Sequence, residues 1–116
     1  MLNHSCTFEV ERQGSVLILT LQGEIDHHSA TQIRTRMDEL IWQERPKKTV
    51  LDLSAIDFMD SSGLGLIMGR YSLMEKLGGE LTLREPNPRI VKIFELAGLF
   101  RLVKIEEVGK EKEEGQ

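Results

Sequence analysis

The chain has 116 residues, of which 40% are apolar and 29% are charged, and its formal net charge is -4. This length suits one domain, and the apolar content is too high for a chain that is disordered throughout. One Trp, one Tyr and four Phe in an acidic chain supply neither the stacking aromatics nor the basic surface that nucleic-acid binding needs. We therefore expect no nucleic-acid partner.

The cellular location can be predicted from three features. Residues 1–5 lack the basic and apolar regions of a signal peptide, and the single Cys6 has no second cysteine for an internal disulfide. The longest apolar stretches, residues 16–21 and 64–68, are much shorter than the roughly 20 residues that span a membrane. We expect a cytoplasmic protein with no membrane insertion.

Three apolar runs in the first half of the chain predict strands. Residues 7–11 and 15–22 flank a turn at Gly14, which predicts a hairpin. The second run is apolar on both faces, as in a strand that is covered on both sides. Gly23 is expected to end that strand, and residues 48–53 form the third run.

A first helix is expected between the second and third strands. Ser29 and Gln32 have the spacing of a capping box, so the helix should begin there, and Pro46 should end it. Its apolar residues recur at steps of three and four, the spacing of one helical face: Ala30, Ile33, Met37, Leu40 and Ile41.

A second helix is expected after Gly63, with Gly78 closing it. Its predicted core stripe contains Leu64, Ile67, Met68, Tyr71, Met74 and Leu77.

The remaining sequence predicts a strand over residues 80–84, a helix over 89–97 that Gly98 caps, and a last strand over 102–105. Residues 106–116 are rich in Glu and Lys, which indicates either a frayed helix or a disordered tail.

The predicted order is therefore ββαβαβαβ, with helices between successive strands. Right-handed crossovers should build a mixed, mostly parallel sheet flanked by helices, with one antiparallel edge strand. We predict a single α/β domain with a folded core over residues 6–105 and a charged tail over 106–116. Residues 24–29 and 56–63 leave the carboxyl ends of neighbouring strands, so they should gather at one edge, where ligands and partners usually bind.

Ser61 lies in the connection between the third predicted strand and the second predicted helix. One interpretation is a helix cap, because Ser and Asp are preferred at such positions for stability alone. The other is phosphorylation, because the first backbone N–H groups of a helix tolerate added negative charge. In that case the fold need not change, and the phosphate would act on a partner.

Small side chains form a stripe along the second predicted helix. This stripe is either a docking face or a surface that packs tightly against the sheet, and the sequence leaves both possibilities open. Two glycines inside one helix suggest some use, since each costs about 1 kcal/mol relative to Ala. Its members are Ser62, Gly65, Gly69, Ser72 and Lys76.

Catalytic and metal sites are poorly supported. Ser61 lacks the Gly two residues before it that a nucleophile elbow carries, although His27 or His28 could in principle act as a base. Asp26 and the two histidines could be imagined as metal ligands, but adjacent side chains diverge and no further ligand is suitably spaced. We expect no cofactor and no metal. Asp26 and one histidine either line the functional edge or belong to a solvated loop.

The motifs taken together resemble the STAS domain of anti-sigma factor antagonists, and in particular the antagonists that act in sporulation. The resemblance covers nearly the whole chain and rests on the order of its segments. These are Gly23-Glu24-Ile25-Asp26-His27-His28-Ser29-Ala30, Phe58-Met59-Asp60-Ser61-Ser62-Gly63-Leu64-Gly65, Gly69-Arg70-Tyr71, Gly78-Gly79-Glu80 and Gly98-Leu99-Phe100.

The resemblance implies a partner-switching protein that is not an enzyme. By this likeness, the unphosphorylated protein binds an ADP-bound anti-sigma factor, itself a serine kinase, and so frees the sigma factor. Phosphorylation of Ser61 blocks binding, and a serine phosphatase restores it. The partner-binding residues would be Asp26, His27, Met59, Asp60, Ser62, Gly63, Leu64, Gly65 and Met68.

The sequence leaves other functions open. The chain could be another STAS phospho-switch or scaffold, for example in the general stress response, or a weak nucleotide-binding or hydrolysing protein. When free it is expected to be a monomer. The family usually ends in an apolar helix, whereas the sequence after Ile105 is polar. A short C-terminal helix is therefore not predicted by the apolar pattern of this segment, only by the resemblance.

Overall fold

A computed structural model describes residues 5–107. The elements follow the predicted order ββαβαβαβ, with a short 3₁₀ turn (Leu99–Arg101) before the last strand. They are β1 (Cys6–Gln13), β2 (Val16–Ile25), α1 (His27–Glu44), β3 (Lys48–Met59), α2 (Ser62–Lys76), β4 (Glu80–Arg84), α3 (Pro88–Ala97) and β5 (Lys104–Glu106).

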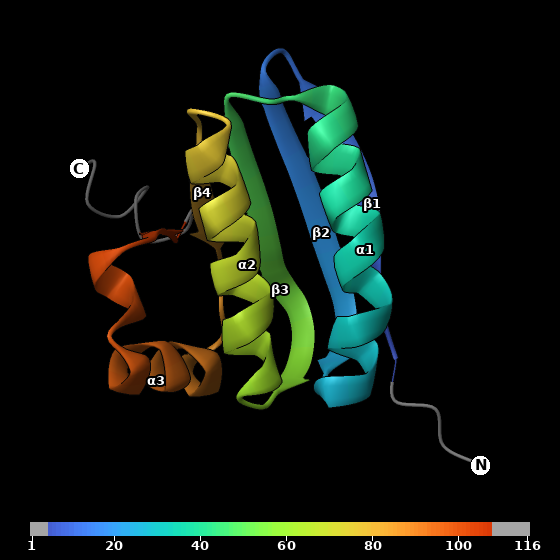
Figure 1. The fold of residues 1–116 in the computed structure, drawn as a ribbon. Helices are drawn as coiled ribbons and strands as arrows, with labels where there is room; N and C mark the ends of the chain where they lie inside the picture. Colours follow the sequence, from blue (N-terminus) through green and yellow to red (C-terminus); the bar gives the residue numbers. More distant parts are fainter. Residues whose placement is uncertain (1–4, 108–116) are drawn as a thin grey trace.

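The five strands form one sheet in the order β1-β2-β3-β4-β5. β1 is antiparallel to β2, and the other neighbours are parallel. Figure 1 shows α1 and α2 side by side on one face of this sheet and α3 beyond the β4 side. The prediction of an α/β fold with a mixed, mostly parallel sheet is confirmed.

The core lies between the sheet and the two long helices. Leu19, Leu51 and Leu83 are fully buried at the centres of β2, β3 and β4, and they share one cluster with Met37 of α1 and Met74 of α2. Burying a side chain of this size contributes about 1.5–3 kcal/mol relative to leaving it exposed. This cluster fixes both helices on the sheet.

The second face of the sheet is buried in part, at the centres of β2 and β3. Ile18 and Val50 point away from the main core cluster, yet only 5% and 0% of their surfaces are exposed. The apolar run of residues 16–21 predicted a strand covered on both sides, and this holds on the second face for Ile18, whereas Val16 and Thr20 are half-buried.

β2 and β3 are longer than predicted: β2 continues past Gly23 to Ile25, and β3 continues to Met59. Gly23 does not end its strand. Its φ is +105°, a Cβ there would collide with the carbonyl oxygen of Ser5, and the pairing register with β3 shifts next to it. Glycine here permits an irregular pairing inside a strand, which local sequence does not distinguish from a strand end.

The buried face of α2 is rotated from the predicted stripe. Leu66, Arg70 and Leu73 are buried, whereas Leu64 and Tyr71, both predicted as core, are only half-buried. The rotation arises because α2 packs against α1 as well as against the sheet. A core stripe derived from apolar residues alone could not include Arg70.

The end of the described chain differs slightly from prediction. β5 covers Lys104–Glu106 rather than residues 102–105, because the 3₁₀ turn occupies the preceding residues. Glu106, expected in the charged tail, accepts hydrogen bonds from Arg84 (3.1 Å) and Lys48 (3.3 Å). The rest of the predicted tail and the possible C-terminal helix, from residue 108 onward, lie outside the described residues.

Among residues 5–107, no helix has both the length and the apolar character of a membrane span.

Candidate functional site

The structure brings the two predicted loops together. Ile25 and Met59 are paired at the ends of β2 and β3, and the backbone N–H of Asp60 donates to the carbonyl of Ile25 at 3.0 Å. Asp26 and Asp60 therefore follow adjacent strand ends. The N-terminal ends of α1 and α2 lie side by side at the same edge of the sheet (Figure 1).

Asp26 is the N-cap of α1. Its Oδ1 accepts from the backbone N–H of Ser29 at 2.9 Å, and its own N–H donates to the Ser29 hydroxyl at 2.9 Å. The sequence predicted Ser29 as the start of a capping box with Gln32, and this was wrong. Ser29 is instead the third residue of a box that Asp26 opens, and α1 begins at His27.

The charge of Asp26 is held by this cap. The backbone N–H of Ser29 lowers the pKa of the Asp26 carboxyl below its ordinary value of 3.8. A carboxyl with a lowered pKa stabilises the fold when it is charged, so its contribution is present above about pH 4 and is lost as the pH falls through the lowered value. At neutral pH Asp26 presents a fixed negative charge at the site edge.

Replacing Asp26 tests this assignment. Asp26→Ala is expected to lower the free energy of unfolding by about 1 kcal/mol, the usual loss for an N-cap. Asp26→Asn should retain most of that stability, because Asn caps helices as well as Asp does. Urea denaturation of the three proteins at pH 7 measures the difference. Equal destabilisation by both variants would contradict the cap and indicate that the charge itself is required.

Ser61 is the N-cap residue of α2 by its position, but its side chain does not cap the helix. Its side chain makes no capping hydrogen bond, and Oδ1 of Asp60 instead accepts from the backbone N–H of Ser62 at 2.8 Å. Within residues 5–107 the Ser61 hydroxyl forms no hydrogen bond, and the residue is exposed. The segment does cap the helix, but the side chain that does so is Asp60 and not Ser61. The Ser61 hydroxyl is available to another protein.

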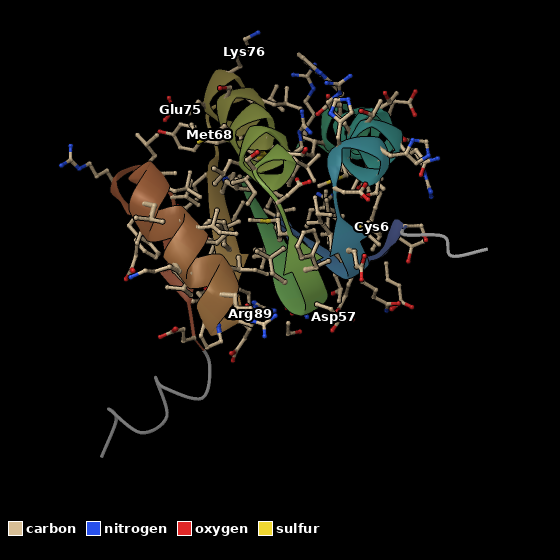
Figure 2. All side chains as sticks on the ribbon, turned by 90° about the horizontal axis from the view of Figure 1, so that it is seen from below. Cys6, Asp57, Met68, Glu75, Lys76 and Arg89 are labelled. Carbon is tan, nitrogen blue, oxygen red and sulfur yellow. The ribbon has the colours of Figure 1, made fainter. Side chains whose placement is uncertain are left out.

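The other predicted partner-binding residues differ in how much of their surface is exposed. His27 and Gly65 are exposed, and five residues are half-buried: Asp26, Asp60, Ser62, Leu64 and Met68. Figure 2 shows Met68 on the flank of α2 nearer to α3, away from α1.

Met59 and Gly63 are buried, so they present little surface to a partner. A Cβ at Gly63 would collide with Cγ and Sδ of Met59. This close approach shapes the turn beneath Ser61.

The small-residue stripe of α2 faces away from the sheet. A Cβ at Gly65 or Gly69 would meet no atom within 4 Å, and Ser72 and Lys76 are exposed. In Figure 2 Lys76 lies on the side of α2 farthest from the sheet. Tight packing of the stripe against the sheet is wrong, and the stripe is open to another surface.

A groove separates the first turns of α1 and α2, beside Ser61. We call it the α1–α2 groove, and its volume is about 220 Å³. Four of its residues were not predicted for the site: Ala30, Thr31, Arg34 and Leu66. Thr31 and Arg34 follow His27 at helical spacing on one face of α1, a signal that could have indicated them. Its lining comprises His27, Ala30, Thr31, Arg34, Ser62, Gly65 and Leu66.

An ion pair bridges the two helices one turn beyond the groove. Nε of Arg70 lies 2.9 Å from Oδ1 of Asp38, and only 5% of the Arg70 side chain is exposed. Burial lowers the pKa of Arg70, Asp38 raises it, and the positive charge of Arg34 lowers it further. Arg70 and Asp38 thus link α1 to α2 next to the α1–α2 groove.

Catalytic chemistry has little support in this arrangement. Within the described residues, no serine hydroxyl is hydrogen-bonded to a histidine, and no group of three or more His, Cys, Asp or Glu side chains is placed to hold a metal ion. The site is a surface of loop ends, small residues and one groove, which suits contact with another macromolecule.

Comparison with known proteins agrees with this geometry. Residues 7–111 match the STAS domain family. The anti-sigma F factor antagonist of Paenibacillus polymyxa is 42% identical over 97 residues, which cover 84% of this chain and 83% of that protein. The chain also resembles two structures of the antagonist SpoIIAA at 29% identity. The unphosphorylated form matches with a TM-score of 0.76 over 93% of this chain and 95% of that one. The phosphorylated form matches with a TM-score of 0.69 over 95% and 100%.

Proposed function

The chain belongs to the STAS-domain family of anti-sigma factor antagonists, and from this membership we propose that it binds an anti-sigma factor under the control of phosphorylation at Ser61. Members of this family are regulators that act without catalysis of their own. The partner is an anti-sigma factor of the F type that is also a serine kinase, bound in its ADP form. A serine phosphatase reverses the modification and resets the protein for binding.

The exposed, unbonded hydroxyl of Ser61 carries this proposal. A kinase needs a serine whose oxygen can be reached without breaking the fold, and Ser61 meets this requirement because Asp60 caps α2 in its place. The neighbouring backbone N–H of Ser62 is occupied by that cap. Solved structures of the similar antagonist SpoIIAA in both phosphorylation states further support a phosphorylated form of this chain.

The docking surface of the proposal is the loop edge with the start of the α2 stripe. Asp26 and Asp60 flank Ser61 there, and Gly65 offers a place where another backbone can come close. We expect the sporulation sigma factor to be the one released, in line with the 42% identity to an antagonist of anti-sigma F factor.

A phosphorylation assay tests the proposed site. Intact mass after incubation with ATP and the anti-sigma factor kinase of the same organism should show one added phosphate, about 80 Da, on the wild type. Ser61→Ala should lose this gain, and the matched variant Ser62→Ala should keep it. Loss only in Ser62→Ala would move the site by one residue. No gain on the wild type would contradict the phospho-switch.

A further inference from the structure

We propose that the α1–α2 groove receives a carboxylate side chain of the anti-sigma factor, with Arg34 as its ion-pair partner. This inference rests on the proposed function and adds the chemistry of the contact. None of the partner-binding residues expected from the sequence is a lysine or an arginine.

Arg34 is the unpaired cation of the groove. It lines the groove, is exposed, and forms no ion pair or hydrogen bond within residues 5–107. The nearby carboxylates are each engaged: Asp26 with Ser29, Asp60 with Ser62, and Asp38 with Arg70. The site therefore offers one positive charge that no neighbouring side chain neutralises.

Arg70 adds a second positive charge near the α1–α2 groove, which favours binding of an anion there. Its Nη1 is buried and has no hydrogen-bond partner in the described residues, and its charge is close enough to repel that of Arg34. The carboxylate of Asp38 pairs with Arg70 and leaves the charge of Arg34 unbalanced. A carboxylate in the groove would balance Arg34.

The shape of the groove fits one acidic side chain. Its volume, about 220 Å³, suits a carboxylate with its methylene groups, and Ala30 and Leu66 give it apolar walls. Gly65 has open space where a side chain would otherwise stand, so the partner's backbone can approach the rim. A partner chain can therefore insert an Asp or Glu without moving either helix.

This contact would also couple binding to phosphorylation. Ser62, the neighbour of Ser61, lines the groove. A phosphate on Ser61 adds a charge of about -1.5 to -2 beside it. That charge would repel the incoming carboxylate and compete with it for Arg34.

Charge reversal in the groove tests the inference. Affinity for the ADP-loaded anti-sigma factor is measured by calorimetry between 50 and about 300 mM salt for four unphosphorylated proteins. Arg34→Glu is expected to weaken binding by about 30-fold and to reduce the salt dependence. Thr31→Glu, which adds a charge to the groove and leaves Arg34 in place, should also weaken binding. Lys92→Glu changes the net charge of the chain as Arg34→Glu does, but at an exposed position of α3, and its affinity should stay within about twofold of wild type.

The outcomes separate this inference from the proposed function. If wild type, Arg34→Glu and Lys92→Glu all bind the anti-sigma factor with the same affinity, the inference is overturned and the proposed function stays intact. Normal binding by Arg34→Glu with faster removal of its Ser61 phosphate would place the chain's own phosphate in the groove and likewise overturn it. No binding by wild type would overturn both. Thermal unfolding of each variant confirms that an affinity loss does not come from unfolding.

Discussion

Phosphorylation of Ser61 is expected to weaken binding of the anti-sigma factor by about 140-fold to 3,700-fold. An unpaired phosphate inside an interface loses several kcal/mol through desolvation and through repulsion from nearby carboxylates. Asp26 and Asp60 supply such carboxylates at this edge. A loss of about 3–5 kcal/mol gives the stated range, since each 1.4 kcal/mol is a factor of ten.

The backbone should change little in the phosphorylated protein. The capping side chain of α2 is Asp60, and the Ser61 hydroxyl forms no hydrogen bond, so the added group breaks no hydrogen bond of the fold. Calorimetry on both forms measures the affinity, and backbone amide chemical shifts measure the structural response. Shifts limited to residues near 24–30 and 58–66 support direct blocking. A displacement of the whole of α2, or tight binding by the phosphorylated form, would contradict it.

Gly65→Leu is expected to abolish measurable binding while leaving the fold at least as stable as wild type. Glycine in an exposed helix costs about 1 kcal/mol relative to other residues, and a Cβ at position 65 meets no atom within 4 Å. The free protein should therefore unfold at the same or a higher temperature. The partner, in contrast, would meet a bulky side chain where Gly65 leaves open space.

Two matched variants serve as controls, one for the size of the side chain and one for its position on the stripe. Gly65→Ala should stabilise the helix with a much smaller loss of affinity, because its side chain is one methyl group. Ser72→Leu places the same bulk on the same stripe two turns farther from Ser61, about 10 Å along the axis, and should reduce binding less. If Gly65→Leu binds the anti-sigma factor with wild-type affinity, the α2 stripe is not part of the docking surface.

The order of the elements could be predicted because hydrophobic periodicity and turn residues determine it locally. Gly14, Pro46 and Gly98 lie where the sequence indicated a turn or a helix end. The start of α1 was placed wrongly because Asp26 and Ser29 both have capping side chains, and only the path of β2 shows which one precedes the helix.

The site was predictable in part, because the loops after β2 and β3 must meet at one edge of a parallel sheet. Arg34 could not be assigned in this way. A lone arginine on a helix is usually a solvated charge, and its position in a groove depends on how α1 and α2 pack. The burial of Arg70 depends on the same packing and on Asp38, which is 32 residues away in the sequence.

Release of a sigma factor tests the central claim most directly. A preformed complex of the sigma factor with its ADP-loaded anti-sigma factor is mixed with this protein, and native mass spectrometry measures the free sigma factor. We predict that the unphosphorylated protein releases the sigma factor and that the Ser61-phosphorylated protein does not. Release by both forms, or by neither, would contradict the account.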